Sequence, residues 1–347
     1  MFSQITDYQN LLTAYYLTRR SRRYQSEFQK IEMRYELLLS QLQWKLKNGF
    51  YHPKPYHQFL VCEPKKRQVS APHLYDRIVH HAIINTINPT FESIFIPHSY
   101  ACRKYKGALV NKNELVESYQ QIYQKNPKFY AYKSDIKSYF KKINHSILFQ
   151  LLQQHLTCPQ TLNLLKIIID SYQETLNTGI PIGNLTSQLF ANLYLHPLDT
   201  FVTQTIGQPN YFRYMDDFVI LSSDKEYLIN LRCLIAGFLK HFLKLELHPK
   251  KNNIFRADFG LDFVGFLIKP NSVTLRKKTL RRHQRHFKRR LKLIKKIKAR
   301  QDLEKVASIQ TKIKSSGYSF RGFLKNTDFQ ENSRSYKING ITISKEF

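Results

Sequence analysis

The feature that most constrains the fold is a segment in which two adjacent carboxylates interrupt apolar, strand-forming sequence. Residues Tyr211–Ser222 are mostly aromatic and aliphatic around Asp216-Asp217. Adjacent acids repel each other and Asp disfavours a strand, so the pattern indicates two short strands that meet at an acidic turn. A divalent cation would relieve the repulsion at the edge of this apolar platform. An ordinary exposed turn is the alternative, and for this dipeptide alone it is favoured.

A third acid changes this balance. Phe129–Asp135 alternates like a strand that ends on an acid, about eighty residues upstream of the dipeptide. If this strand lies beside the hairpin, Asp135 meets Asp216 and Asp217 at one end of a sheet. Two metal ions roughly 3.5–4 Å apart can there lower the pKa of a 3′-hydroxyl and stabilise a pyrophosphate leaving group. Carboxylate ligands suit Mg²⁺, and phosphoryl transfer needs little beyond positioning and charge neutralisation.

A turn that contains glycine and proline, Gly179–Gly183, leads into a helix expected from about Leu185 to Val202. The two glycines permit close approach of the backbone to a ligand. Asn184 or Thr186 is expected to cap the helix. Such a helix start is a plausible floor for a nucleotide pocket. A capped helix after a turn is the alternative, and it is favoured when the segment stands alone.

The charge of the chain indicates a polyanionic partner. The 347 residues include 55 Lys and Arg against 25 Asp and Glu, which gives a net charge of +30. Nucleic acid is the commonest such partner. An anionic membrane surface is the weaker rival, because no apolar run reaches the roughly 18 residues of a spanning helix. The polar N-terminus (Met1–Gln9) and four widely spaced cysteines favour a cytoplasmic protein with unpaired thiols.

The remaining pattern predicts an alternation of helices and strands. Helices are expected near Leu11–Leu17, from about Phe28 to Leu46, and over residues 75–88, about 145–172 and 226–243. Further strands are expected at Gln58–Cys62, Arg67–Ala71 and 261–268. Trp44, the only tryptophan, is expected in the core. The tail from Leu275 to about Lys314 is helical in pattern and strongly basic. The alternation implies one mostly antiparallel sheet backed by helices.

Together these segments resemble the reverse transcriptases. Asp135 is followed five residues later by Phe140, and a Gly-x-Pro-x-Gly turn leads into a Ser-Gln and Ala-Asn helix. Tyr-Met-Asp-Asp stands at Tyr214–Asp217, and Phe263–Phe266 is similar to the primer grip of the family. The motifs follow the family's order over about residues 55–270. Four ordered motifs are far more specific than any one of them.

The resemblance is closest to the reverse transcriptases of diversity-generating retroelements in phages and bacteria. The segments that carry it are Glu63–Lys65, Tyr100–Arg103 with Lys106-Gly107, Ile180–Gln188 and Arg213–Asp217. Another bacterial reverse transcriptase, defence-associated or similar to group II intron enzymes, is the alternative within the enzyme class. A non-catalytic RNA-binding protein on a polymerase scaffold is the alternative outside it.

The resemblance implies an α+β right-hand polymerase. N-terminal helices and fingers are expected in residues 1–127. An RRM-like palm with an antiparallel sheet is expected in residues 128–268, with a helical segment on the fingers side at about 147–177. A basic helical thumb is expected in residues 269–347.

The resemblance also implies roles for single residues. Asp135, Asp216 and Asp217 are the expected catalytic residues, and with Ile136 they bind two Mg²⁺ ions, for which Mn²⁺ can substitute. Phe140 is the expected steric gate against a ribose 2′-hydroxyl. The expected nucleotide-binding residues are Lys65, Arg67, Arg77, Phe140, Pro181, Ile182, Gly183 and Gln188. Phe263, Val264, Gly265 and Phe266 form the expected primer grip. The expected nucleic-acid contacts of the thumb are Arg276, Lys277, Lys278, Arg281, Arg282, Arg285, Lys288 and Arg289.

One of these residues, Arg77, has an alternative role in an ion pair with Asp76 or a neighbouring acid. The activity implied by the resemblance is RNA-templated addition of deoxynucleotides to a primer. Frequent misincorporation is expected, because Ile182 stands where retroviral enzymes have a Gln that contacts the nucleotide sugar, and the family resemblance implies that the errors fall chiefly opposite template adenine. Packing alone is the alternative role for Ile182. The implied partners are template RNA, a cDNA or DNA primer, dNTPs and a small basic helical oligomeric accessory protein, without a membrane.

Overall fold

The computed structural model describes residues 1–20, 22, 24, 26–62, 66–298, 303–324, 327, 336–338 and 341–343. Lys65, an expected nucleotide-binding residue, lies outside the described residues. The chain divides into two compact units, which we call unit 1 and unit 2. Unit 1 comprises Met1–Tyr105, Lys133–Phe218 and Asn230–Asn253, and unit 2 comprises Lys106–Tyr132, Val219–Ile229 and Ile254–Phe347.

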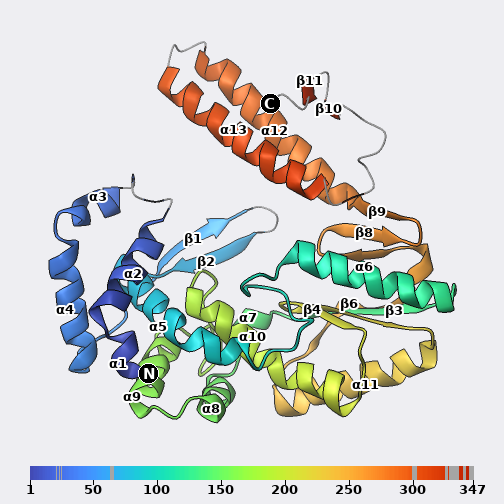
Figure 1. Ribbon diagram of the computed structural model, residues 1–347, viewed down its shortest axis with the longest axis horizontal. Helices are drawn as coiled ribbons and strands as arrows, with labels where there is room; N and C mark the ends of the chain where they lie inside the picture. Colours follow the sequence, from blue (N-terminus) through green and yellow to red (C-terminus); the bar gives the residue numbers. More distant parts are fainter. Residues whose placement is uncertain are drawn as a thin grey trace. The chain divides into compact units, whose positions relative to one another are not determined.

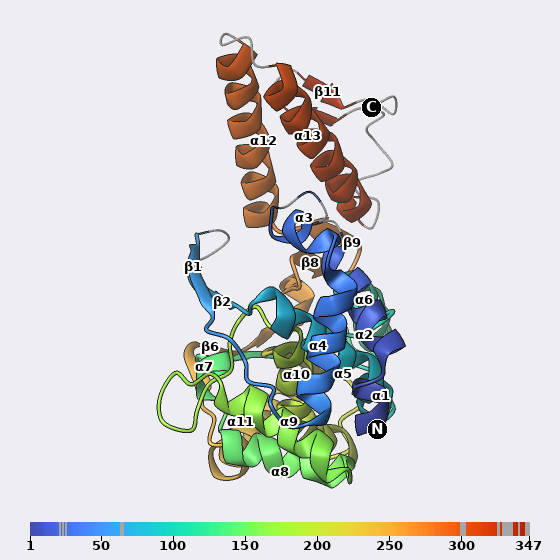
Figure 2. The same ribbon diagram turned by 90° about the vertical axis from the view of Figure 1, so that its left-hand side faces the viewer.

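Helices form the N-terminal part of unit 1. They are α1 (Phe2–Ile5), α2 (Tyr8–Arg19), α3 (Ser26–Glu32), α4 (Tyr35–Lys47) and α5 (Leu74–Glu92). Helix α5 packs against α1 and α2, and α4 packs against α2 (Figures 1 and 2). The helix expected over residues 75–88 is therefore confirmed. The expectation for Trp44 is wrong: its side chain is 57% exposed and stacks on Phe50, with 5.3 Å between ring centroids.

Two strands follow α4 and form a hairpin. Strand β1 (His57–Val61) pairs antiparallel with β2 (Arg67–Ala71), with Phe59 opposite Val69. The sequence predicted both strands to within one residue. Pairing of this kind fixes which side chains share a face, because neighbouring residues along a strand point to opposite faces.

A four-stranded sheet carries the three predicted acids. Its strands are β3 (Tyr130–Ile136), β4 (Tyr211–Tyr214), β5 (Asp217–Ser222) and β6 (Leu247–Arg256), in the order β4-β5-β3-β6. The predicted acidic hairpin is confirmed, and β3 lies beside it as the sequence argument required. Strand β6 was not predicted. The accompanying helices are α7 (Tyr139–Lys142), α8 (His145–His155), α9 (Pro159–Asp170), α10 (Leu185–Thr200), a π-helical turn at Phe201–Thr205, and α11 (Lys225–Phe242).

In the part of the chain that the structure describes, unit 2 contains two small sheets, of three and two strands, and long helices. The elements are α6 (Ala108–Lys125), a 3₁₀ turn at Ala257–Phe259, β7 (Leu261–Phe263), β8 (Phe266–Lys269), β9 (Ser272–Leu275), α12 (Lys277–Lys298), α13 (Leu303–Leu324), β10 (Tyr336–Ile338) and β11 (Ile341–Ile343). Strands β7, β8 and β9 are antiparallel, and α12 packs along α13 (Figure 1). Hydroxyl Oη of Tyr119 on α6 donates a 2.7 Å hydrogen bond to the carbonyl of Ala257.

The single strand expected over residues 261–268 is wrong. The segment is a hairpin that turns at Val264 and Gly265, both with positive φ (41° and 94°), so that Phe263 pairs with Phe266. Two consecutive residues with positive φ make the tight turn whose twist suits a hairpin. A valine in this conformation is unusual, which is why the sequence did not reveal the turn.

Two expectations drawn from composition can be checked. The cysteines Cys62, Cys102, Cys158 and Cys233 are free thiols, as expected. Within the part of the chain that the structure describes, no helix is long and apolar enough to cross a membrane.

Candidate active site

The three predicted acids lie at one edge of the four-stranded sheet, all in unit 1. Asp135 is the penultimate residue of β3 and is 9% exposed. Asp216 and Asp217 stand at the turn between β4 and β5 and are half-buried. The N–H of Ile136 donates a 3.2 Å hydrogen bond to the carbonyl of Asp216, which joins the end of β3 to the acidic turn. The backbone therefore brings the predicted residues together.

The side chains of the three acids are not arranged as a metal-binding cluster. Among the described residues, no three His, Cys, Asp or Glu side chains are placed to hold a metal ion. Instead, the ammonium of Lys251 on β6 forms an ion pair with Asp135. This lysine supplies positive charge to a carboxylate that neighbouring acids would otherwise repel. Sequence reasoning missed Lys251 because β6 itself was not predicted.

A buried arginine holds the acidic turn from behind. Arg213 is fully buried, and its Nε and Nη2 donate to the two carboxylate oxygens of Asp199 at 2.7 and 2.6 Å. Nη1 donates to the carbonyl of Met215 at 3.0 Å and to Oδ1 of Asn192 at 3.2 Å. Met215 has a φ of 60°, a left-handed conformation that costs energy for this residue type. The guanidinium thus fixes the strained residue directly before Asp216.

The charge of Arg213 is compatible with its burial. Burial favours the neutral form, but the carboxylate of Asp199 outweighs it and raises the pKa of Arg213 above its ordinary value. Tyr211 Oη also donates to Asp199 at 2.8 Å, and Nη2 of Arg213 donates to Ser99 Oγ at 3.0 Å. A buried ion pair needs such additional hydrogen bonds to offset its desolvation. The sequence had singled out Arg213 only through its place in the Arg-Tyr-Met-Asp-Asp motif.

The turn Gly179–Gly183 joins the acid-bearing sheet region to the β1–β2 hairpin. Ile180 N–H donates to the carbonyl of Phe140 at 2.8 Å, and Ser70 N–H on β2 donates to the carbonyl of Ile182 at 3.0 Å. Gly183 has a φ of 130°, and a Cβ there would lie 3.0 Å from the carbonyl oxygen of Ser70. A side chain at this position would be strained and would crowd Ser70, so glycine is required here for packing against β2. Close approach of this backbone to a ligand stays a prediction.

The expected helix cap is wrong in its chemistry. Asn184 occupies the cap position of α10, but its side chain accepts no hydrogen bond from the helix start. Its Nδ2 donates instead to Tyr56 Oη at 3.1 Å. Asn184 Oδ1 and Thr186 Oγ1 are buried without a hydrogen-bond partner among the described residues. The tertiary contact with Tyr56 takes precedence over local capping here.

A pocket of about 600 Å³ in unit 1 collects several predicted nucleotide-binding residues. Arg77, Gly183 and Gln188 line it. The other lining residues are Leu17, Thr18, Arg20, Arg22, His57, Phe59, Val69, Ala71, Pro72, His80, His81 and Leu185. The arginines give the pocket a positive potential that suits phosphate. Phe140, Pro181, Ile182 and Arg67 do not line it.

The surroundings of Arg77 bear on the alternative of an ion pair. Arg77 Nε donates to the carbonyl of Pro72 at 2.9 Å. Asp76 accepts hydrogen bonds from Tyr51 Oη at 2.9 Å and from the N–H of Lys54 at 3.0 Å. Burial raises the pKa of Asp76, and the two hydrogen bonds oppose that shift. The geometry thus assigns Asp76 to its own buried hydrogen bonds, and phosphate binding by Arg77 stays a prediction.

The expected primer grip and thumb residues all belong to unit 2. Phe263–Phe266 forms the β7–β8 turn, where the carbonyl of Gly265 accepts from the N–H of Arg276 at 3.0 Å. Arg276 is ion-paired with Asp262. The other expected thumb contacts are exposed on α12: Lys277, Lys278, Arg281, Arg282, Arg285, Lys288 and Arg289. Their contacts with nucleic acid stay predictions.

Comparisons with known proteins agree with this geometry. Residues 53–268 match the family described as reverse transcriptase (RNA-dependent DNA polymerase). The chain is 24% identical over 279 residues to protein YkfC of Escherichia coli strain K12, covering 68% of this chain and 72% of that protein. It is 25% identical over 168 residues to the group II intron-encoded protein LtrA of Lactococcus lactis subsp. cremoris, covering 46% of this chain but only 27% of that protein.

A solved structure of apo telomerase from Candida tropicalis, truncated from its C-terminal domain, has a similar fold. Its TM-score is 0.53 at 12% identity, and the match covers 70% of this chain and 60% of that chain. At this identity the likeness concerns the fold alone.

Proposed function

This chain belongs to the reverse transcriptase family, the RNA-dependent DNA polymerases, and we propose that it extends a primer 3′ end by copying an RNA template. Its α+β architecture is consistent with the polymerase fold of that family. The observation that carries the proposal is that the backbone brings Asp135, at the end of β3, beside the turn that holds Asp216 and Asp217. A hydrogen bond of 3.2 Å from Ile136 N–H to the Asp216 carbonyl joins the strands there.

Members of the family use divalent metal ions, and the donor set of this chain suits them. Three carboxylates at one sheet edge are hard oxygen ligands of the kind Mg²⁺ prefers, with substrate phosphates completing its coordination. We propose two Mg²⁺ ions, replaceable by Mn²⁺, held by Asp135, Asp216 and Asp217 with Ile136 beside them. When bound, such ions would neutralise charge on the transferred phosphoryl group and lower the pKa of the 3′-hydroxyl. Lys251 would release Asp135 when a cation binds.

The chain's own residues position the nucleotide in this proposal. Arg77 and Gln188 contact the incoming dNTP from the walls of the 600 Å³ pocket, and Gly183 lets the backbone approach it. Phe140, whose carbonyl is tied to Ile180, stands as the gate against a ribose 2′-hydroxyl. Arg67 on β2 is exposed and available to the triphosphate. Pro181 is buried and supports the turn.

Extension of a DNA primer annealed to an RNA template tests the activity. The purified chain should add dNTPs up to the end of the template with Mg²⁺, and should stop when the metal is omitted. RNA binding without extension under any divalent metal would favour a non-catalytic RNA-binding protein on a polymerase scaffold. Extension of the same primer on a DNA template of the same sequence shows whether the chain prefers an RNA template.

We further propose that the chain belongs to the diversity-generating class and misincorporates opposite template adenine. The support is the sequence resemblance and the position of Ile182, which is half-buried in the Gly179–Gly183 turn before α10, where its carbonyl accepts a hydrogen bond from Ser70 of β2. Isoleucine cannot hydrogen-bond to the sugar, so a contact that distinguishes correct from incorrect pairs is lost, at a scale of about 1–3 kcal/mol. A defence-associated or intron-like reverse transcriptase is the alternative, and it predicts no bias toward adenine.

Sequencing of cDNA made by the wild type and by Ile182→Gln tests this fidelity proposal. The variant should show a lower error rate opposite adenine and an unchanged rate opposite the other bases. Equal error rates at every template base in both proteins would show that fidelity is set elsewhere. Leu176→Gln, at an exposed position in the loop before the turn that lines neither pocket, controls for a general effect of a new amide near the turn.

Partners complete the proposal. Template RNA, a DNA primer and dNTPs are its substrates, and a small basic helical oligomeric protein is the proposed accessory. The net charge of +30 supports the nucleic-acid partners. The accessory protein and a cytoplasmic location rest on the sequence argument. Specific synthesis from the cognate template by the purified chain alone would remove the need for the accessory protein.

A further inference from the structure

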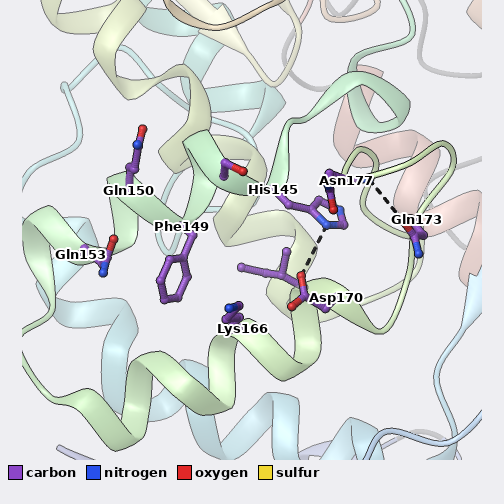
Figure 3. A pocket seen from close by; sticks show the side chains of 10 residues that line it. His145, Phe149, Gln150, Gln153, Lys166, Asp170, Gln173 and Asn177 are labelled. Atoms are coloured by element: carbon purple, nitrogen blue, oxygen red, sulfur yellow. Dashed lines mark hydrogen bonds and ion pairs between the residues drawn. The ribbon is translucent and has the colours of Figure 1, made fainter.

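A second pocket, of about 520 Å³, opens in unit 1 between α8, α9 and the loop that follows α9 (Figure 3). It shares no lining residue with the nucleotide pocket described above. Its volume lies within the range of roughly 300–1,000 Å³ that small-molecule sites occupy. Neither the sequence motifs nor the proposed polymerase reaction gives this pocket a role.

Primary amides dominate the pocket wall. Gln150 and Gln153 stand on α8, and Gln173 and Asn177 stand on the loop at the opposite side (Figure 3). Gln150 and Gln153 are exposed. Gln173 Oε1 accepts a 3.3 Å hydrogen bond from the N–H of Asn177. Each amide offers a donor and an acceptor at the same end of the side chain.

An aromatic ring and two opposite charges lie between these amides. Phe149 is half-buried, and the ammonium of Lys166 lies 5.9 Å from the centre of its ring. The carboxylate of Asp170 lies 3.7 Å from Nδ1 of the buried His145 (Figure 3). The pocket therefore combines the face of an aromatic ring, a cation, and several amide donors and acceptors. These groups together match the chemistry of a nucleotide. The base can stack on the ring and the phosphate can meet the lysine.

We propose that this pocket binds one unpaired adenine nucleotide, either within an RNA strand or free. Gln and Asn amides pair with adenine through its N6 amino group and N7, whereas guanine is more often read by Arg or Lys. A simple inorganic anion fits less well, because Asp170 opposes the single lysine. An apolar ligand fits less well, because it would leave the amides without water or partners. The strongly basic chain concentrates polyanionic strands at its surface.

The pocket is joined to the Gly179–Gly183 turn through its floor. His145 Nε2 lies 2.7 Å from the carbonyl oxygen of Gly179, and the backbone N–H of His145 donates to the carbonyl of Asn177 at 2.9 Å. Gly179 N–H in turn donates to the carbonyl of Ile143 at 2.8 Å. A nucleotide that contacts Asn177 is therefore linked to the turn through the hydrogen bonds of His145. The binding inference itself does not depend on polymerase activity.

Calorimetric titration of the full chain with AMP, GMP, CMP and UMP, in buffer without divalent cations, tests the site. AMP should bind most tightly to the wild type. Gln150→Ala/Gln153→Ala should weaken AMP binding by about tenfold, since two amide hydrogen bonds are lost. Gln154→Ala is the matched control, because Gln154 is an exposed neighbour on α8 that does not line the pocket. All three substituted residues are exposed, so folding should be unaffected.

Photo-crosslinking separates the two sources of the nucleotide. A single-stranded RNA that carries one 8-azidoadenosine, and free 8-azido-AMP, are each irradiated with the full chain, and labelled peptides are mapped. Labelling of residues 145–177 by the RNA, competed by AMP, supports a strand nucleotide. Labelling by 8-azido-AMP alone supports a free nucleotide. The proposal is overturned if neither probe labels this segment, or if AMP binds the double variant and the wild type equally well.

Discussion

At the scale of single residues, the acidic turn depends on a guanidinium that lies behind it. Arg213 spans from Asp199 on α10 to the carbonyl of Met215, directly before Asp216. No solvent reaches either partner of this ion pair. Removal of one partner would leave the other charged and buried, which is more costly than removal of both. The two roles of Arg213, stability and turn geometry, can therefore be separated by mutation.

We expect Arg213→Met to lower the free energy of unfolding by about 3–5 kcal/mol, because Asp199 is left unpaired. Arg213→Met/Asp199→Leu should recover most of that loss, since no buried charge remains. The double variant should nevertheless add nucleotides more slowly than the wild type, and it should need a higher Mg²⁺ concentration for the half-maximal rate, because the Met215 carbonyl is no longer held. Urea unfolding and single-nucleotide addition measure the two effects. A stable double variant with wild-type metal dependence would contradict the role in turn geometry.

A second residue-scale effect concerns acid stability. His80 on α5 is 1% exposed, and neither ring nitrogen has a hydrogen-bond partner among the described residues. Burial, with a smaller contribution from His81, lowers the pKa of His80 to about 3 from its ordinary value of 6.5. Between these two pH values the unfolded chain binds a proton that the folded chain rejects. Stability contributed by neutral His80 is therefore complete above pH 6.5 and is lost as the pH falls toward 3.

From this shift we expect a loss of about 2 kcal/mol in the free energy of unfolding between pH 7 and pH 5 from His80 alone. His80→Leu should reduce the pH dependence by that amount, although its absolute stability can differ. Urea unfolding at the two pH values measures it. Ile83→Leu, a buried substitution on the same helix that changes no titratable group, is the control and should retain the wild-type pH dependence. An unchanged pH dependence in His80→Leu would show that His80 does not titrate in this way.

At the scale of elements, α12 presents a basic face, and its own sequence contains no Asp or Glu. His283 stacks on Phe320 of α13 with 3.6 Å between ring centroids, and this contact fixes which side of α12 faces its partner helix. Residues at spacings of three and four share one side of a helix. Arg281, Arg285 and Lys288 therefore follow each other along exposed surface, with Arg282 beside them. The basic face of α12 suits the phosphates of a template–primer duplex.

Neutralisation of this face should flatten the salt dependence of RNA binding. A variant in which Gln replaces all four of Arg281, Arg282, Arg285 and Lys288 removes four positive charges. If all four side chains contact phosphates, the slope of log K against log salt concentration should fall by up to about three. The matched control replaces four exposed lysines of other helices, Lys45, Lys47, Lys225 and Lys240, with Gln. Fluorescence anisotropy over a salt series gives both slopes. Equal slopes for the two variants would mean that general charge, not the face of α12, binds RNA.

Across the whole molecule, the elements that could be predicted from the sequence are those that local residue patterns determine. The β1–β2 hairpin, the helix at 75–88 and the acidic hairpin follow from strand and helix periodicity, and all are confirmed. The meeting of Asp135 with the hairpin could also be predicted, because an acid at a strand end is a local signal and the motifs fix the order of the strands.

Long-range partners could not be predicted in the same way. Strand β6 has a half-exposed, lysine-rich pattern without clean alternation, so Lys251 and its ion pair with Asp135 escaped notice. Ser99 is 114 residues from Arg213, and their hydrogen bond has no local signature. Trp44 was placed in the core because large aromatics usually are buried, whereas it stacks on Phe50 at the surface. These features arise only when segments distant in sequence pack together.

The central claim is that Asp135, Asp216 and Asp217 act together in metal-dependent nucleotide addition. The most direct measurement is the rate of single-nucleotide addition to a primed RNA template by Asp216→Asn and Asp135→Asn. Each should lose roughly a hundredfold or more in rate, because transition-state charge is left uncompensated, while circular dichroism shows an intact fold. Glu226→Gln, at an exposed acid on α11, should match the wild type. Addition by Asp216→Asn at a rate within a few-fold of the wild type would contradict the assignment.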